Sequence, residues 1–178
     1  IIFLLLIGGG ITFVLTREDA DQVIGKANEQ YDNQNYQAAQ DMYMSFLESF
    51  GNDNQYSSMA RARITMTELY KAAEFKQEPW QAVELEKEKL PLVADEPGMN
   101  EERPNLAALM VDIAANLADS AGRATETEKK QSLLAVLDEQ LMLMENPQYM
   151  MSSVKVTLAS QIQNVIESRA RVQRDISR

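Results

Sequence analysis

Carboxylates are the side chains in this sequence whose number and spacing come closest to a reactive or metal-binding group. They form two runs: Glu84, Glu86 and Glu88, then Asp95, Glu96, Glu101 and Glu102. A calcium ion needs about six to eight oxygen atoms converging from a tight loop, and neither run has the spacing of such a loop. An acid pair for glycoside hydrolysis needs an apolar cleft around one carboxyl group, and no such cleft is indicated. We therefore interpret both runs as solvated helix faces.

Other kinds of catalytic site are excluded by composition. The sequence has no cysteine and no histidine, so it has no disulfide, thiolate nucleophile, zinc finger or histidine-based catalysis. The glycines at Gly8–Gly10 are not followed by the lysine and the serine or threonine of a phosphate-binding loop. We expect a protein that is not an enzyme and that holds no cofactor and no metal ion.

The charge of the chain restricts its partners. Its 178 residues carry a net charge of −10, whereas binding to nucleic acid requires a basic face. The sequence is 45% hydrophobic, which is enough to form a core, and it is rich in good helix formers. We expect protein partners and no nucleic acid, and the sequence leaves the oligomeric state open.

Four methionines cluster near one junction between helices: Met142, Met144, Met150 and Met151. Methionine is flexible and polarizable, which suits either an irregular core or an adaptable binding surface. Filling the core is the simpler interpretation. Met150 and Met151 are adjacent and cannot both face the same core from a regular helix, so one of them is a candidate contact for a partner protein.

The first fifteen residues, Ile1 to Leu15, contain no charge. This segment is shorter than the roughly 20 residues that span a bilayer, and we interpret residues 1–16 as a transmembrane helix truncated at its N-terminus. The hydrophobic part of a signal peptide and a buried helix of a soluble protein are the alternatives. Gly8 and Thr12 share one helix face and could allow close helix pairing in the membrane, although glycine is also common in membrane helices.

The residues after this segment indicate its orientation. One cation, Arg17, is followed by the acids Glu18, Asp19 and Asp21, unlike a cytoplasmic flank. We predict a single-pass membrane protein whose soluble part lies outside the cytoplasm, on the periplasmic side. The sequence begins with Ile and ends within a helical pattern, so we expect both ends to be truncated.

The remaining residues repeat apolar side chains at helical spacing, and no segment has the alternation of a strand. Helices are predicted over 20–33, 36–50 and 56–73, with Gly51 as a glycine cap. Pro91 and residues 94–104 are expected to break the helices. The predicted fold is all-α, with the transmembrane helix followed by antiparallel helical hairpins over 17–91, a linker over 92–104 and further hairpins over 105–178.

Within the first hairpin, small and aromatic residues form a recognisable pattern. These residues are Ala27, Tyr31, Tyr36, Ala39, Tyr43 and Phe46. The pattern resembles a tetratricopeptide (TPR) repeat of bacterial membrane-anchored envelope proteins, and the resemblance covers roughly residues 20–52. It implies that these six side chains pack a TPR-like hairpin, in a stack whose concave side holds a partner's peptide or helix.

The sequence therefore predicts a membrane-anchored, non-catalytic scaffold that mediates protein–protein interaction or assembly at the cell envelope. One alternative is an accessory subunit of a larger, energy-transducing membrane complex. The other is the stalk of a longer protein, because the sequence also resembles the N-terminal part of proteins that carry a C-terminal PQQ-like β-propeller.

Overall fold

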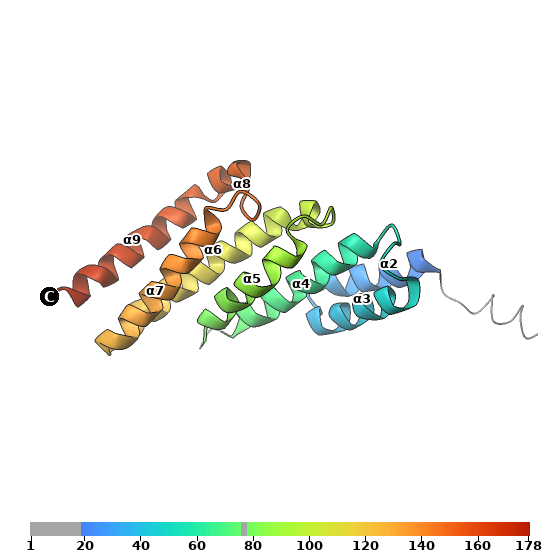
Figure 1. Cartoon of the computed structure of the whole chain (residues 1–178). Helices are drawn as coiled ribbons and strands as arrows, with labels where there is room; N and C mark the ends of the chain where they lie inside the picture. Colours follow the sequence, from blue (N-terminus) through green and yellow to red (C-terminus); the bar gives the residue numbers. More distant parts are fainter. Residues whose placement is uncertain (1–18, 76–77) are drawn as a thin grey trace, which may run out of the picture.

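The computed structural model describes residues 19–75 and 78–178, and every regular element in these ranges is an α-helix. The helices are α2 (Ala20–Asp32), α3 (Tyr36–Phe50), α4 (Ser57–Glu74), α5 (Trp80–Val93), α6 (Met99–Arg123), α7 (Thr127–Met144), α8 (Ser152–Thr157) and α9 (Ala159–Ile176). The prediction of an all-helical fold is thus confirmed for the described residues (Figure 1).

The helices form an elongated stack, with α2 at one end and α9 at the other (Figure 1). Consecutive helices pack as the pairs α2–α3, α4–α5 and α6–α7. Helices α2, α4, α6 and α9 also contact one another in that order, and they form one layer against which α3, α5 and α7 pack. The chain therefore builds its core by stacking hairpins side by side, so that each apolar face is covered by the next pair.

Polar residues and a glycine determine where the helices of the first hairpin begin and end. The side chain of Asp19 caps α2 by accepting a hydrogen bond from the Gln22 amide at 2.9 Å. Helices α2 and α3 are separated by a short polar turn, in which Gln34 has a φ of 61°. Gly51 ends α3 with a φ of 79°, a conformation that glycine adopts without strain. Its ψ of −179° places it outside the left-handed helical region that was expected of a glycine cap.

Two prolines lie inside helices and do not break them as predicted. Pro91 lies in the last turn of α5, and Pro104 lies in the second turn of α6. A proline near a helix end removes one main-chain hydrogen bond, and packing of the neighbouring turns can offset that loss. Only residues 94–98 of the predicted linker lie between helices.

Gly98 brings the start of α6 against the start of α4. A Cβ atom at Gly98 would lie 2.5 Å from the Cα atom of Met59, closer than real contacts allow. The Gly98 amide also donates a hydrogen bond to the Ser58 hydroxyl at 2.8 Å. The two helices therefore meet here backbone to backbone, which only glycine permits.

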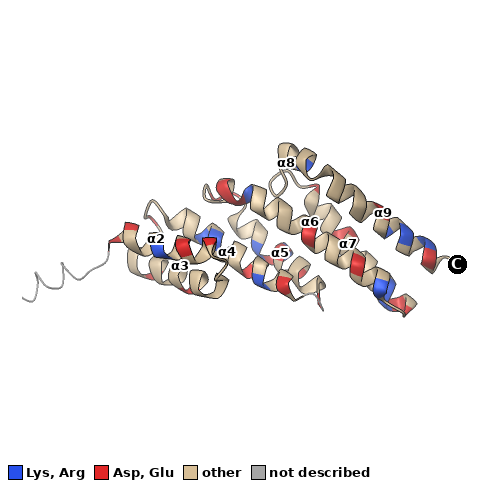
Figure 2. Cartoon of the chain, turned by 180° about the vertical axis from the view of Figure 1, so that it is seen from behind, with Lys and Arg blue, Asp and Glu red and all other residues tan. Residues whose placement is uncertain are grey.

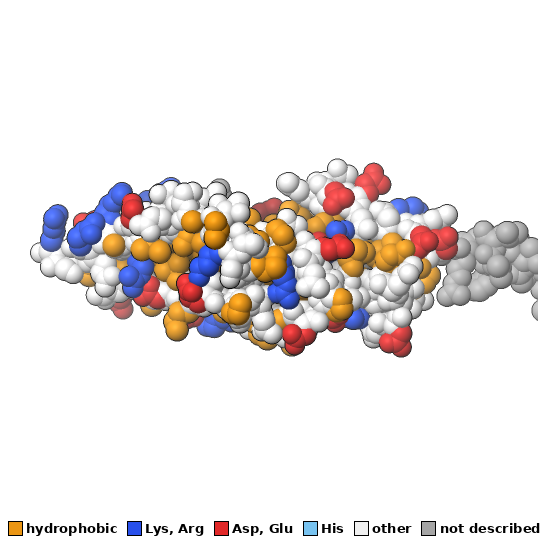
Figure 3. All heavy atoms as spheres, turned by 90° about the horizontal axis from the view of Figure 1, so that it is seen from above, with side chains coloured by type: hydrophobic (Ala, Val, Ile, Leu, Met, Phe, Trp, Pro, Cys, Tyr) orange, Lys and Arg blue, Asp and Glu red, His pale blue; other side chains and the backbone are white. Residues whose placement is uncertain are grey.

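The core extends along the whole stack. Its largest fully buried side chains are Tyr43, Phe46, Met66, Leu69, Leu90, Met99, Leu106, Met110, Ile113, Leu117, Leu137 and Met144. Seen from above, apolar side chains also reach the surface along the middle of the stack (Figure 3).

The predicted membrane anchor, residues 1–16 with Gly8 and Thr12, lies outside the residues that the structure describes. Among the helices between residues 19 and 178, none combines the length and the apolar character that crossing a bilayer requires.

Candidate protein-binding groove

The six residues that carry the TPR resemblance lie in α2 and α3. Five are buried, namely Ala27, Tyr31, Ala39, Tyr43 and Phe46, and Tyr36 is half-buried. The Tyr31 ring meets the rings of Tyr36 and Tyr43 edge to face, with centroids 6.1 and 6.3 Å apart. Phe46 packs elsewhere, with its ring centroid 5.0 Å from that of Phe50. The structure therefore divides the predicted set between a tyrosine cluster and a separate phenylalanine contact.

A buried carboxylate, Glu102 of α6, joins the tyrosine cluster to the rest of the stack. Its two oxygens accept hydrogen bonds from the Arg63 Nε atom at 2.9 Å and from the Tyr31 hydroxyl at 2.8 Å. The Asn105 side-chain amide donates a third, at 3.0 Å. Glu102 is 2% exposed, so the prediction that it lies on a solvated face is wrong. The hydrogen bonds from these three donors explain why the charge of Glu102 is tolerated in the interior of the protein.

Arg63 of α4 extends this network to the first hairpin. Its guanidinium donates to the Asn28 side-chain oxygen at 2.7 Å and lies 4.8 Å from the centre of the Tyr31 ring. The Tyr43 hydroxyl donates to the same Asn28 oxygen, also at 2.7 Å. These contacts connect α2, α3, α4 and α6. Sequence reasoning missed Arg63 and Asn28, because their partners lie far away along the chain.

The tyrosine cluster reaches a surface groove through two stacked rings. The rings of Tyr36 and Tyr70 lie 4.6 Å apart and nearly parallel, and both line the groove. Burial, then the charge of nearby groups, raises the pKa of Tyr70 to about 12. Burial also raises the pKa of Tyr36. Both hydroxyls are therefore neutral at physiological pH and present an uncharged aromatic wall.

The groove consists of two hollows that follow α6, and we call it the α6 groove. The first, between α4 and α6, has a volume of about 520 Å³. The second, between α6 and α9, has a volume of about 420 Å³. Asp112, Ala115 and Asn116 line both hollows, which therefore adjoin each other along α6. Further lining residues are Gln34, Tyr36, Tyr70, Ala73, Glu74, Asn105, Ala108 and Leu109 in the first hollow, and Val111, Ala118, Asp119, Gln161, Asn164, Val165 and Ser168 in the second.

The lining of the α6 groove is acidic and rich in amides. Glu74, Asp112 and Asp119 contribute carboxylates, and none of the lining residues is lysine or arginine. The side-chain amides of Asn116 and Asn164 make no hydrogen bond to any other residue in the described part of the chain. Positive charge instead gathers toward the C-terminal end of α9 (Figure 2). The groove therefore offers negative charge and free polar groups that could pair with the main chain of another molecule.

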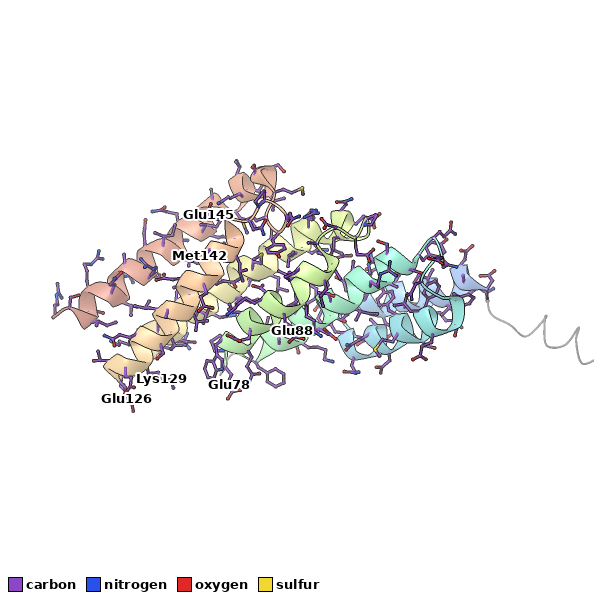
Figure 4. The ribbon with its side chains drawn as sticks, in the orientation of Figure 1. Glu78, Glu88, Glu126, Lys129, Met142 and Glu145 are labelled. Atoms are coloured by element: carbon purple, nitrogen blue, oxygen red, sulfur yellow. The ribbon has the colours of Figure 1, made fainter. Side chains whose placement is uncertain are left out.

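The methionines predicted to meet a partner lie outside the groove. Met150 is buried at 2% exposure, and Met151 is half-buried. Met142 is the exposed member of that cluster, at 74% (Figure 4). Of the adjacent pair, Met151 is thus the more accessible, and Met142, which was not one of the two candidate contacts, is more accessible than either.

The first predicted run of solvated carboxylates is also only partly exposed. Glu84 and Glu88 are exposed, and Glu88 is labelled in Figure 4, but Glu86 is fully buried. Neither carboxyl oxygen of Glu86 has a hydrogen-bond partner among the described residues, and the side-chain oxygen of nearby Gln140 also has none. The prediction of a solvated Glu86 is therefore wrong, because the residue follows the buried stripe of α5, four residues after Ala82 and four before Leu90.

Within residues 19–75 and 78–178, no three carboxylates converge in a way that could hold a metal ion. The arrangement is suited to binding an extended or helical segment through charge, amides and aromatic rings. Comparisons of the chain with protein-family models, with curated proteins and with solved structures gave no match.

Proposed function

We propose that this protein is a membrane-anchored, non-catalytic helical scaffold that binds a segment of a partner protein in the α6 groove. The soluble part lies outside the cytoplasm in this proposal, and its hairpins act as a TPR-like stack. The single observation that carries the proposal is the pair of adjoining hollows along α6, with a lining of carboxylates, free amides and stacked tyrosines.

The chemistry of the lining favours a basic partner segment. Asp119 pairs with Arg123 at 2.6 Å, but Glu74 and Asp112 have no lysine or arginine beside them in the lining. A lysine or arginine of the partner would supply the opposite charge for these two carboxylates. Asn116 and Asn164 could donate to and accept from the partner's main chain. The Tyr36–Tyr70 pair offers an aromatic face on which an arginine can stack.

A random-peptide selection against the full chain, purified in a mild nonionic detergent, tests this proposal. We expect the selected peptides to be rich in lysine and arginine and to bind more weakly as salt is added. Binding is then measured by fluorescence anisotropy on two variants. Ala115→Trp fills the groove at a point that lines both hollows, and Ala135→Trp places the same bulk on an exposed position of α7.

The proposal requires Ala115→Trp to weaken peptide binding at least tenfold, which corresponds to about 1.4 kcal/mol, while Ala135→Trp leaves the affinity unchanged. Selected peptides without basic residues, or equal affinities of the two variants, would contradict it. The anchor has a separate test. The full chain should fractionate with membranes, and a chain beginning at Asp19 should not.

A further inference from the structure

A carboxyl group inside the middle of the stack has no role in the α6 groove. Glu86 of α5 is 0% exposed, and both of its oxygens lack a hydrogen-bond partner among the described residues. A buried carboxylate without partners is strongly disfavoured. The neutral acid is a much better fit to this site, because it has one proton to donate and carries no charge.

Gln140 of α7 supplies the matching acceptor. Its side-chain nitrogen already donates to the Met110 carbonyl oxygen at 3.2 Å, and its side-chain oxygen lacks a donor. A proton on Glu86 could be donated to that oxygen. One O–H group would then satisfy a buried donor and a buried acceptor together, and α5 would be joined to α7 and, through Gln140, to α6.

Several charged groups on the helices packed against α5 form ion pairs with residues other than Glu86. Ion pairs hold Glu68 of α4 with Lys89, at 3.7 Å, and Glu139 of α7 with Lys87, at 2.8 Å. In α4 and α6, Arg63 and Glu102 pair with each other at 2.9 Å. Further along α7, Asp138 pairs with Arg169 of α9. No charged group among the described residues is hydrogen-bonded to Glu86, so an ionised Glu86 would lack a compensating partner.

We propose that Glu86 is a proton-dependent switch, in which the neutral acid bonded to Gln140 holds α5 against α7 and its ionisation loosens this joint. Burial raises the pKa of Glu86 from its usual 4.5 to about 8. The transition thus lies within the range that cells and their surroundings reach.

The sign of the effect on stability follows from proton binding. Between about pH 4.5 and pH 8 the folded state keeps a proton on Glu86 that the unfolded state has released. Folding is therefore most favoured by this group below pH 4.5, and stability falls as the pH rises to about 8. Within that window the equilibrium constant for unfolding gains up to about tenfold for each pH unit from this group alone.

The only tryptophan of the sequence reports on the same joint. Trp80 is the first residue of α5, and it lines a hollow together with Leu133 and Val136 of α7. Any separation of the two helices would expose its ring to water and change its fluorescence. A pH titration of the native protein can therefore follow the opening directly.

The test uses the full chain in a mild nonionic detergent, as the wild type and as the variants Glu86→Gln and Glu84→Gln. Glu86→Gln keeps a donor for Gln140 but cannot ionise. Glu84→Gln is the matched control, because Glu84 lies in the same helix with a side chain that is 71% exposed. Urea unfolding is measured across the pH range, together with Trp80 fluorescence without urea.

We expect the wild type and Glu84→Gln to show the pH-dependent loss of stability and a fluorescence transition near pH 8, and Glu86→Gln to lack both. The same pH dependence in all three proteins would overturn the proposal. Should Glu86→Gln fail to fold, infrared spectroscopy of the wild type decides the matter. A neutral carboxyl band that persists at neutral pH and disappears near pH 8 supports the switch, and full ionisation of all carboxyl groups at pH 6.5 overturns it.

Discussion

Two glutamates in this stack are buried, but they differ in their hydrogen-bond partners. Glu102, between the first hairpin and α6, receives hydrogen bonds from Arg63, Tyr31 and Asn105. Glu86, between α5 and α7, receives none from the described residues. The two side chains differ little in exposure, at 2% and 0%. At nearly equal burial the two glutamates differ in their partners: an ion pair fastens the first region, and in our proposal a neutral acid fastens the second.

The difference also separates two kinds of joint. The network around Glu102 joins four helices through a guanidinium, hydroxyls and amides, and each added donor makes it harder to open. The joint at Glu86 depends on a single proton. We expect the joint at Glu86 to respond to pH, and four variants can break or sharpen the contrast between the two joints.

The largest effect is expected from Arg63→Met, which removes the cation from Glu102. An uncompensated buried carboxylate costs about 3–5 kcal/mol in the free energy of unfolding, measured by urea denaturation. Arg61→Met is the control, because Arg61 and Glu96 form a similar pair, 2.6 Å apart, that is considerably more exposed. It should cost about 1 kcal/mol or less. Equal losses would mean that Glu102 does not depend on Arg63.

A smaller loss is expected from Glu102→Gln, which keeps the shape but removes the charge that Arg63 pairs with. We predict a cost of about 2 kcal/mol at neutral pH, because hydrogen bonds to charged groups are lost. Glu101→Gln, at the exposed neighbouring position, should change stability little in the same denaturation series. A Glu102→Gln protein as stable as the wild type would remove the contrast with Glu86.

Tyr43→Phe tests how closely the first network is coupled. The substitution removes the hydroxyl that donates to Asn28, 2.7 Å away, and that accepts from Arg63 at 3.3 Å. We expect a loss of about 1 kcal/mol, measured by thermal and urea unfolding. In the Arg63→Met background the same change should cost less, since the two residues share partners. Additive losses would show that the network is a set of independent bonds.

The smallest effect is expected from the double change Glu86→Leu with Gln140→Leu. Replacing both buried polar groups by apolar ones of similar size should alter stability by less than about 1 kcal/mol near neutral pH, or raise it slightly. Glu86→Leu alone should be less stable than the pair, because it leaves the Gln140 oxygen without a donor. A double variant that is markedly less stable than either single variant would show that the contact between Glu86 and Gln140 contributes more to stability than this prediction assumes.

The helices were predictable because apolar residues repeat at helical spacing, and this signal is local. The break between α2 and α3 was equally visible, because helices were predicted over 20–33 and 36–50. The prediction that helices break at Pro91 and Pro104 was wrong. Proline disfavours helix in isolation, but tertiary packing holds these turns in α5 and α6. The short break at residues 94–98 therefore appeared longer in the sequence than it is.

The groove could not be predicted from the sequence, because its walls come from α4, α6 and α9 and meet only in the folded chain. Glu102 was hidden for the same reason, since Arg63 lies 39 residues away. Glu86 was different, because its spacing from Ala82 and Leu90 places it on the buried stripe of α5. A prediction based on this spacing, and not on the polarity of the side chain, would have identified Glu86 as buried.

At the start of α4 and α6, the lack of a side chain at Gly98 determines the distance between the two helices, and with it the width of the proposed binding groove. Gly98 lets the two backbones touch near Met59, so the helices are spaced there by main chain alone. Both helices then run on as stiff rods to the turns that carry Tyr70 and Asp112, which form opposite walls of the first hollow. A methyl group at residue 98 would push the starts of α4 and α6 apart. Because both helices are stiff, the distance between them would also increase several turns away, at the first hollow, where the partner segment is expected to lie.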